Sequence, residues 1–284
     1  MDSDTGRDDR VLATTRALSA FIAPFLLVAF VLLYGFPGQT ARLWAWPIQS
    51  HLTSMLLASA YLGGCWFFLR VLLVERRWAA VRMGFVSVAL FATMLGIATV
   101  LHWDKFAHAK VAFWLWAGLY FTAPFLVVAA WLTNQRYTAV SRPEEPSLGR
   151  VTKTVVAGFG ALAVGTGMLM FLLPTRAISL WPWALTPLTC RVVGATFCLG
   201  GAGLGVLVDD RWETVRLMRR VQLVMFALIL VAAVRARSEL LTDRPLTWVM
   251  GAGFVLVFAG SLLSEVRDWR PRHTGRHTLR PHAP

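Results

Sequence analysis

The chain has 284 residues, of which 57% are hydrophobic and 15% are charged, and its formal net charge is +13. Soluble domains carry about 25% charged residues, so this composition excludes an ordinary soluble protein and indicates a polytopic membrane protein. The positive charge does not indicate nucleic-acid binding, because the basic residues lie in short loops between apolar stretches. In such loops, positive charge suits orientation against anionic lipid.

Eight apolar stretches follow a polar segment at residues 1–17, which is predicted to be a frayed tail. Each is read as a membrane-crossing helix, because only helices satisfy all backbone polar groups in lipid when no alternating barrel pattern is present. The predicted spans are Leu18–Phe36, His51–Leu73, Gly84–Leu101, Val111–Leu132, Thr154–Leu173, Leu188–Val208, Val221–Val234 and Leu246–Leu263. The span at Val221–Val234 is short and is expected to include Leu217–Arg220 as well. A basic tail is predicted at residues 264–284.

One local sequence occurs twice. Leu43–Gly64 and Leu180–Gly201 align without a gap, and both begin with a Leu-Trp-x-Trp segment and end in Leu-Gly-Gly. The correspondence extends to Arg77-Trp78 and Arg211-Trp212. The chain is therefore predicted to be a tandem repeat of two four-helix units, residues 18–132 and 154–263, joined by a linker at 133–153. Four spans return the chain to its starting side, so the units are expected to share one orientation about an axis along the membrane normal.

Features that both copies share are predicted to serve the fold. Tryptophan and arginine at the ends of spans are typical anchors at membrane interfaces. The predicted anchors are Trp44, Trp46, Trp181 and Trp183 at one interface and Arg77, Trp78, Arg211 and Trp212 at the other.

Features that only the first copy has are the better candidates for function. Three histidines and a carboxylate fall on one predicted side of the membrane, at His51, His102, Asp104 and His108. Imidazoles and a carboxylate can hold a divalent metal or another ligand. Their spacing is non-specific, however, so interfacial histidines without a ligand are the alternative interpretation.

Two prolines also occur only in the first copy. Pro24 and Pro124 each lie in the sequence Ala-Pro-Phe-Leu inside a predicted span. A proline in a helix frees the carbonyl four residues earlier, which here belongs to Ala20 and to Tyr120. Freed carbonyls can line a path for an ion or substrate, and they can equally mark simple kinks.

Three functions remain open. No Asp, Glu or Lys lies at the centre of a predicted span, which argues against a proton relay and favours non-enzymatic transport or binding of an apolar or neutral small molecule between the repeats. A membrane-embedded enzyme acting on a lipid or isoprenoid is the first alternative, and it requires carboxylates that converge on a cavity. The carboxylates available for it are Asp104, Glu144, Glu145, Asp209 and Asp210. A structural or accessory subunit, docked through exposed tryptophans, is the second alternative. The cofactor, the metal and the oligomeric state stay open.

The Leu-Trp-x-Trp-Pro segment, the run LASAYLGG, the ERRW loop and the stretch LHWDKF to FWLWAGLYFTAPFLVV together resemble uncharacterised bacterial, chiefly actinobacterial, multi-pass membrane proteins. The resemblance implies location in a membrane and no activity. Loops on the side of the two termini carry far more Lys and Arg than the opposite loops. The positive-inside rule therefore predicts a cell-membrane protein with both termini in the cytoplasm.

Overall fold

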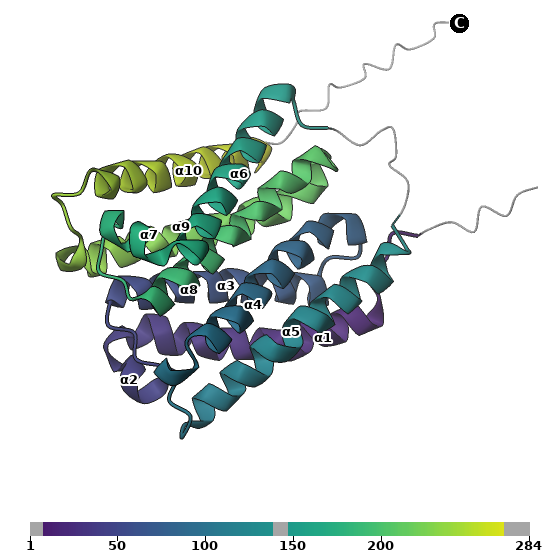
Figure 1. The fold of residues 1–284 in the computed structure, drawn as a ribbon. Coiled ribbons are helices and arrows are strands. Elements are labelled where there is room, and N and C mark those ends of the chain that lie inside the picture. The colour runs from purple at the N-terminus through teal and green to yellow at the C-terminus, as the bar shows by residue number, and fades with distance from the viewer. Residues whose placement is uncertain (1–7, 139–146, 270–284) are drawn as a thin grey trace, which may run out of the picture.

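The computed structural model describes residues 8–138 and 147–269, and it builds this part of the chain from helices (Figure 1). Extended backbone pairs there in only two isolated bridges, between Arg10 and Arg77 and between Ser147 and Arg211. The predicted all-α helix bundle is therefore confirmed. Residues 1–7 of the predicted first tail, 139–146 of the predicted linker and 270–284 of the predicted basic tail lie outside the described residues.

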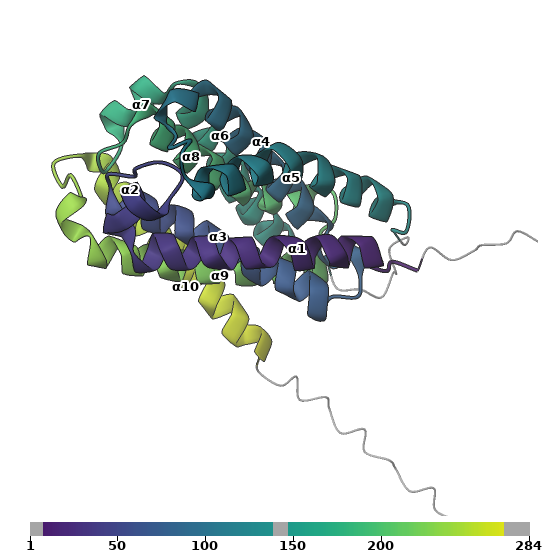
Figure 2. The ribbon, with the colours of Figure 1, turned by 90° about the horizontal axis from the view of Figure 1, so that it is seen from below.

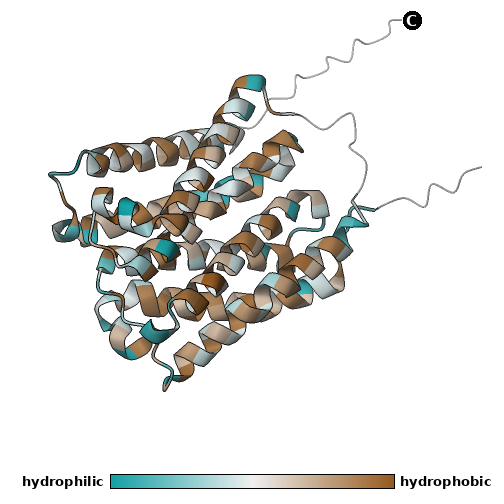
Figure 3. Cartoon of the chain, viewed as in Figure 1, coloured by the Kyte–Doolittle hydropathy of each residue, from teal (hydrophilic) through white to brown (hydrophobic). Residues whose placement is uncertain are grey.

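In the described ranges, eight helices are long and apolar enough to cross a membrane. They are α1 with its continuation (Ala13–Gly35), α3 (His51–Leu73), α4 (Arg82–Leu101), α5 (Val111–Gln135), α6 (Arg150–Leu172), α8 with its continuation (Pro187–Leu207), α9 (Trp212–Arg235) and α10 (Pro245–Trp269). Two short helices, α2 (Thr40–Leu43) and α7 (Pro174–Leu180), belong to the two Trp-rich segments. Hydrophobic residues predominate along the long helices, whereas hydrophilic residues are concentrated at the connections between them (Figure 3). The chain is accordingly a multi-pass membrane protein.

Two of the spans change helix type before they end. The α1 helix finishes as a π-helix at Val31–Gly35, and α8 continues as a 3₁₀-helix at Leu199–Leu207. A 3₁₀ run of nine residues is uncommon, because its hydrogen bonds are poorly aligned and its side chains eclipse. Its sequence, LGGAGLGVL, is rich in glycine, which is a poor α-helix former. The matching part of the first copy, in α3, stays α-helical to Leu73.

The frayed tail predicted for residues 1–17 is wrong from Asp9 onward. Asp9 is buried, its backbone N–H donates to the carbonyl of Tyr137 at 2.9 Å, and its carboxylate accepts from the N–H of Ala79 at 3.0 Å. The φ angle of Asp9 is 53°, which is uncommon for a residue other than glycine. The segment is ordered because these contacts pin it to the connection between α3 and α4.

The long helices pack in matching pairs. The α1 helix lies along α3 as α6 lies along α8, and α4 packs on α5 as α9 packs on α10. Two pairs cross between the halves, α3 with α9 and α4 with α8, so these four helices form the centre of the bundle (Figures 1 and 2). We call the end of the bundle where α1 begins the terminal end, and the other the Trp-segment end.

Several backbone hydrogen bonds occur at positions that the two aligned copies share. Given from N–H donor to carbonyl acceptor, they are Val11 to Arg76 and Leu148 to Asp210 at the terminal end, and Ala107 to Ala45 and Leu241 to Pro182 at the Trp-segment end. These bonds fix the connections between helices in the same way in each half.

The halves differ in how well the last helix is covered. The α5 helix packs against α1 as well as α4, and 33% of its span is buried. The α10 helix packs on α9, makes no comparable contact with α6 in the described part of the chain, and has 6% of its span buried. In Figure 2, α6 lies at the upper side of the molecule and α10 at the lower side. The second half therefore has an open side, between α6 and the α9–α10 pair.

The carbonyl that Pro124 frees is packed against a neighbouring helix. A Cβ added to Gly96 of α4 would lie 2.8 Å from the carbonyl oxygen of Tyr120 in α5. Small residues let membrane helices approach in this way, and the Cα–H groups can then contact the carbonyl. The kink at Pro124 thus belongs to the α4–α5 packing.

Replacing Gly96 by alanine is expected to lower the free energy of unfolding by about 2 kcal/mol, because the added methyl group meets backbone, which cannot swing aside. Gly118 in α5 is the matched control, since nothing lies within 4 Å of its added Cβ. Thermal unfolding of the detergent-purified variants measures both. A stability for Gly96→Ala as high as that of Gly118→Ala would contradict the expectation.

Candidate functional site

The tryptophans of the first Trp-rich segment lie inside the protein. Trp44 and Trp46 are 8% and 2% exposed, and their rings pack on Trp116 with centroids 5.7 and 4.7 Å apart. Trp116 in turn packs on Tyr120, at 4.3 Å. These rings present almost no surface to lipid, so they hold α2, α3 and α5 together and are poorly placed to anchor at an interface.

The second segment repeats this arrangement. Trp181 and Trp183 are each 3% exposed, with ring centroids 5.2 Å apart. The indole N–H of Trp183 donates to the hydroxyl of Thr53 on α3 at 2.8 Å. The segment of one half is thus fixed to a helix of the other.

The predicted anchors at the terminal end are also engaged within the protein. Trp78 is fully buried and donates its indole N–H to Gln135 at 2.9 Å, and Arg77 pairs with Asp9 at 3.1 Å. In the second copy, Arg211 is buried and pairs with Asp209. The guanidinium carbon of Arg219 lies over the ring of Trp212, 4.5 Å from the centroid of that ring. Contacts inside the chain therefore account for all four residues.

The predicted ligand residue His51 lies at a helix cap built by the other half. Glu239, from the connection between α9 and α10, accepts from the backbone N–H of His51 at 3.0 Å and of Leu52 at 3.2 Å, and from the Ser50 hydroxyl at 2.7 Å. The His51 Nδ1 atom is 3.1 Å from the same carboxylate. A carboxylate at a helix N-terminus satisfies free N–H groups and complements the helix dipole.

His102 also contacts the other half. Arg191 of α8 donates from Nη1 to Nε2 of His102 at 2.6 Å, which requires the unprotonated nitrogen. Burial, together with the nearby charge of Arg191, lowers the pKa of His102 below its ordinary value of 6.5. The exposed Asp104 pairs with Lys105 at 2.7 Å, and this contact lowers the pKa of its carboxyl.

His108 packs among rings instead of joining the other two histidines. Its ring centroid is 5.0 Å from that of Trp103 and 4.6 Å from that of Phe113, and its buried Nε2 has no partner. Within the described ranges, no three His, Cys, Asp or Glu side chains are grouped to hold a metal ion. The predicted set of His51, His102, Asp104 and His108 is thus divided among separate partners.

The two predicted prolines lie in different surroundings. Pro24 is exposed on α1, whereas Pro124 is half-buried on α5. One turn from Pro124, the phenol of Tyr120 donates to that of Tyr61 at 3.0 Å, and both rings are buried. Tyr61 and Tyr120 therefore lie within the packed first half.

The aspartates that could serve an enzyme are bound in ion pairs. Asp209 contacts Arg82 of α4 at 2.7 Å and Arg211 at 2.6 Å, while Asp210 contacts Lys153 at 3.1 Å. Burial acts to raise the pKa of Asp209, but the hydrogen bonds and charge of Arg211, with the charge of Arg82, outweigh it and lower the pKa below its ordinary value of 3.8. Glu144 and Glu145 lie outside the described residues.

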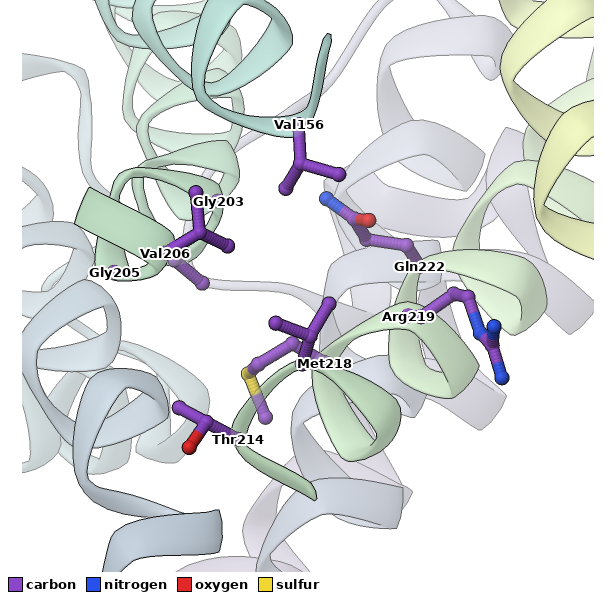
Figure 4. A pocket seen from close by; sticks show the side chains of 10 residues that line it. Val156, Gly203, Gly205, Val206, Thr214, Met218, Arg219 and Gln222 are labelled. Atoms are coloured by element: carbon purple, nitrogen blue, oxygen red, sulfur yellow. The ribbon is translucent and has the colours of Figure 1, made fainter. Parts of the chain in front are cut away.

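A small cavity lies near the terminal end of the second half (Figure 4). Its volume is about 20 Å³, and its walls come from α6, from the 3₁₀ continuation of α8 and from α9. The lining residues are Val156, Ala202, Gly203, Gly205, Val206, Thr214, Val215, Met218, Arg219 and Gln222. Figure 4 shows Val156 and the amide of Gln222 facing each other, while Arg219 turns away.

Aromatic rings fill the matching region of the first half. In the alignment of the copies, Phe68 corresponds to Gly205 and Phe85 to Arg219. The rings of Phe68 and Phe85 are both buried, with centroids 5.9 Å apart, and Phe67 packs on both. In the second half, Met83 of α4 fills the place beside Gly205, since a Cβ added there would lie 2.6 Å from its side chain, and the cavity remains next to this contact.

The sequence analysis assigned no role to Thr214, Gln222 or Glu239. A sequence signal for Thr214 and Gln222 did exist, because the second copy has polar residues and glycine where the first copy has aromatic and apolar residues. No sequence signal could place Glu239 at the start of α3, because that contact depends on how the halves dock.

The chain matches no model of a known protein family, no curated protein and no solved structure. The resemblance to actinobacterial membrane proteins stays a prediction.

Replacing Asp209 by asparagine is expected to lower the free energy of unfolding by about 3 kcal/mol, because Arg82 and Arg211 then keep buried charges without their carboxylate. Asp210→Asn is the matched control and should cost under about 1 kcal/mol, since that pair is partly exposed. Thermal unfolding at neutral pH distinguishes them. Equal losses for the two variants would contradict the assignment.

The pKa of His102 gives the stability a pH dependence. The unfolded chain, with the ordinary pKa of 6.5, binds a proton more readily than the folded chain does. Stability is therefore expected to fall as the pH drops through 6.5, and His102→Gln, which still accepts from Arg191, should flatten this part of the curve. Midpoints of thermal unfolding between pH 7.5 and 5 measure the slope, and an unchanged slope in the variant would refute the assignment.

Proposed function

We propose that this membrane protein holds an apolar or neutral small molecule without chemically changing it, at the cavity in its second half. The observation that carries the proposal is the cavity itself, with Gln222 and Thr214 among apolar walls, at the place where the first half is filled by Phe68 and Phe85. Sites for small molecules are mostly apolar with a few polar groups that fix orientation.

The proposal includes the prediction that the chain consists of two copies of one four-helix unit in the same orientation. The matching helix pairs and the matching backbone hydrogen bonds at both ends support it. The first copy is then the closed form of the four-helix unit, and the second copy is the form with an open side.

A site between the halves, which the sequence favoured, is less well supported. A Cβ on Gly63 of α3 would lie 2.7 Å from Met225 of α9, and Leu188 and Val192 of α8 belong to the same buried cluster as the first half. The contact between halves is thus closely packed, whereas α6 and α10, on either side of the open side of the second half, have 22% and 6% of their spans buried.

The two alternatives have less support. An enzyme needs carboxylates around a cavity, and Asp104, Asp209 and Asp210 are each paired with a basic side chain and are not among the residues that line the cavity. An accessory subunit docked through its two Trp-rich segments needs exposed rings in them, and those of Trp44, Trp46, Trp181 and Trp183 are buried.

The excess of Lys and Arg at the terminal end supports an orientation with this end in the cytoplasm of a cell membrane. The cavity is lined by Val156, in the second turn of α6, and by Thr214, in the first turn of α9. A ligand would then enter from the cytoplasmic leaflet.

Val156→Phe tests the proposal by filling the cavity from α6. The protein is purified in detergent, extracted with organic solvent, and its co-purified lipophilic molecules are identified by mass spectrometry. We expect at least one species to be lost from Val156→Phe and kept in Val155→Phe, the control, whose side chain is 49% exposed on the same helix.

Val156→Leu adds about one methylene group, and it is the milder variant if Val156→Phe folds poorly. The same lipophilic species in wild type, Val156→Leu and Val156→Phe would overturn the proposal.

A further inference from the structure

We propose that the ligand is an amphipathic lipid with one neutral oxygen function, a hydroxyl or a carbonyl, which enters the cavity while the apolar chain lies along the open side of the second half. This rests on the proposed function and adds the chemical class of the ligand and its direction of binding.

The size of the cavity decides what part of a ligand it accepts. Holding one water takes about 10–15 Å³ on the same measure, so about 20 Å³ admits a group of one or two heavy atoms. A phosphate or a sugar is several times larger. The cavity therefore accepts a single oxygen function, and the rest of the ligand stays outside it.

The polar groups of the cavity suit a neutral oxygen. Thr214 is 4% exposed, and its buried hydroxyl has no hydrogen-bond partner in the part of the chain that the structure describes. In Figure 4, Thr214 lies across the cavity from Gln222, with Met218 between them. The half-buried amide of Gln222, which faces Val156 in Figure 4, offers both donors and an acceptor. A buried hydroxyl without a partner is costly, so a ligand oxygen that bonds to it gains affinity.

The cation at the cavity is engaged elsewhere. Arg219 donates to Ser264 at 2.8 Å and to Glu265 at 2.6 Å, both on α10, and its guanidinium covers the ring of Trp212. Arg220 shares the same carboxylate, at 2.5 Å. The cavity thus offers hydrogen bonds without a free positive charge, which disfavours an anionic head group.

The open side provides a path for the apolar chain. On α6, Val155 and Phe159 are each 49% exposed beside the lining residue Val156. On α9, every residue from Val221 to Leu230 is half-buried, and this stretch includes Gln222. Because Arg219 lines the cavity and also reaches Glu265, α10 lies near the cavity.

The test measures binding of radiolabelled hexadecanol and hexadecane to the protein in lipid nanodiscs, with empty nanodiscs subtracted. We expect wild type to bind the alcohol about tenfold more tightly than the alkane, because the two differ in one hydrogen-bonding group. Thr214→Val and Gln222→Met should each lower this preference at least threefold. Thr196→Val is the control, since that buried hydroxyl bonds to its own helix, at the carbonyl of Val192.

Each outcome has a separate meaning. Equal binding of alcohol and alkane by wild type, lost in Val156→Phe, would overturn this inference and leave the proposed function standing. Saturable binding of neither probe would overturn both. If Thr214→Val does not fold, an undiminished preference in Gln222→Met, whose side chain is half-buried, is sufficient to overturn the inference.

Discussion

A lipid bilayer gives apolar helices little reason to prefer each other over lipid, so close packing and polar contacts must hold such a bundle together. In this protein the polar contacts cross between the halves. Glu239 caps α3, Arg191 bonds to His102, Asp209 pairs with Arg82, and Trp183 donates to Thr53. These contacts lie mostly near the ends of the spans, where the charged groups can keep part of their hydration. The docking of α3 on α9 and of α4 on α8 depends on them.

Inside the second half, close packing of the backbone holds α6 and α8 together. A Cβ on Gly167 would lie 2.4 Å from the carbonyl of Gly194, and one on Gly194 would lie 2.6 Å from that of Gly167, so α6 and α8 touch backbone to backbone. Gly203 meets α6 in the same way, at the carbonyl of Val156. This contact holds the 3₁₀ segment at the wall of the cavity. Glycine permits the approach, but it also weakens the α-helix there, which fits the change of helix type.

The sequence could predict the spans because hydrophobic length is a local property, and the eight spans were found within a few residues. The start of α9 was predicted at Leu217 instead of Trp212, because the charged run from Asp209 to Arg216 resembles a loop. In the structure, Arg219 and Arg220 both pair with Glu265 of α10. The contact of these arginines with Glu265 is tertiary, so the hydropathy of the sequence could not predict it.

The candidate site was harder to predict for a related reason. Trp44 and His51 attract attention as chemistry-bearing residues, yet a ring or an imidazole near a span end can face lipid, protein or a ligand, and only the packing decides which. Trp44 is surrounded by rings and His51 by a carboxylate from the other half. Predicting either contact required knowledge of how the two halves dock.

The two copies differ in residues gained and in side-chain volume, and the two kinds of difference have different consequences for packing. A residue gained by one copy, such as His102, can be absorbed by a new partner such as Arg191. Side-chain volume lost by one copy is harder to absorb in a close-packed protein, because space left behind forfeits contacts. Gly205 and Arg219 stand where the other copy has two phenylalanines. Met83 of α4 fills the place beside Gly205, and Arg219 turns away towards Glu265. Among the described residues, the Thr214 hydroxyl combines two features, since it lacks a hydrogen-bond partner and lines a cavity, and this is why a ligand is best sought there.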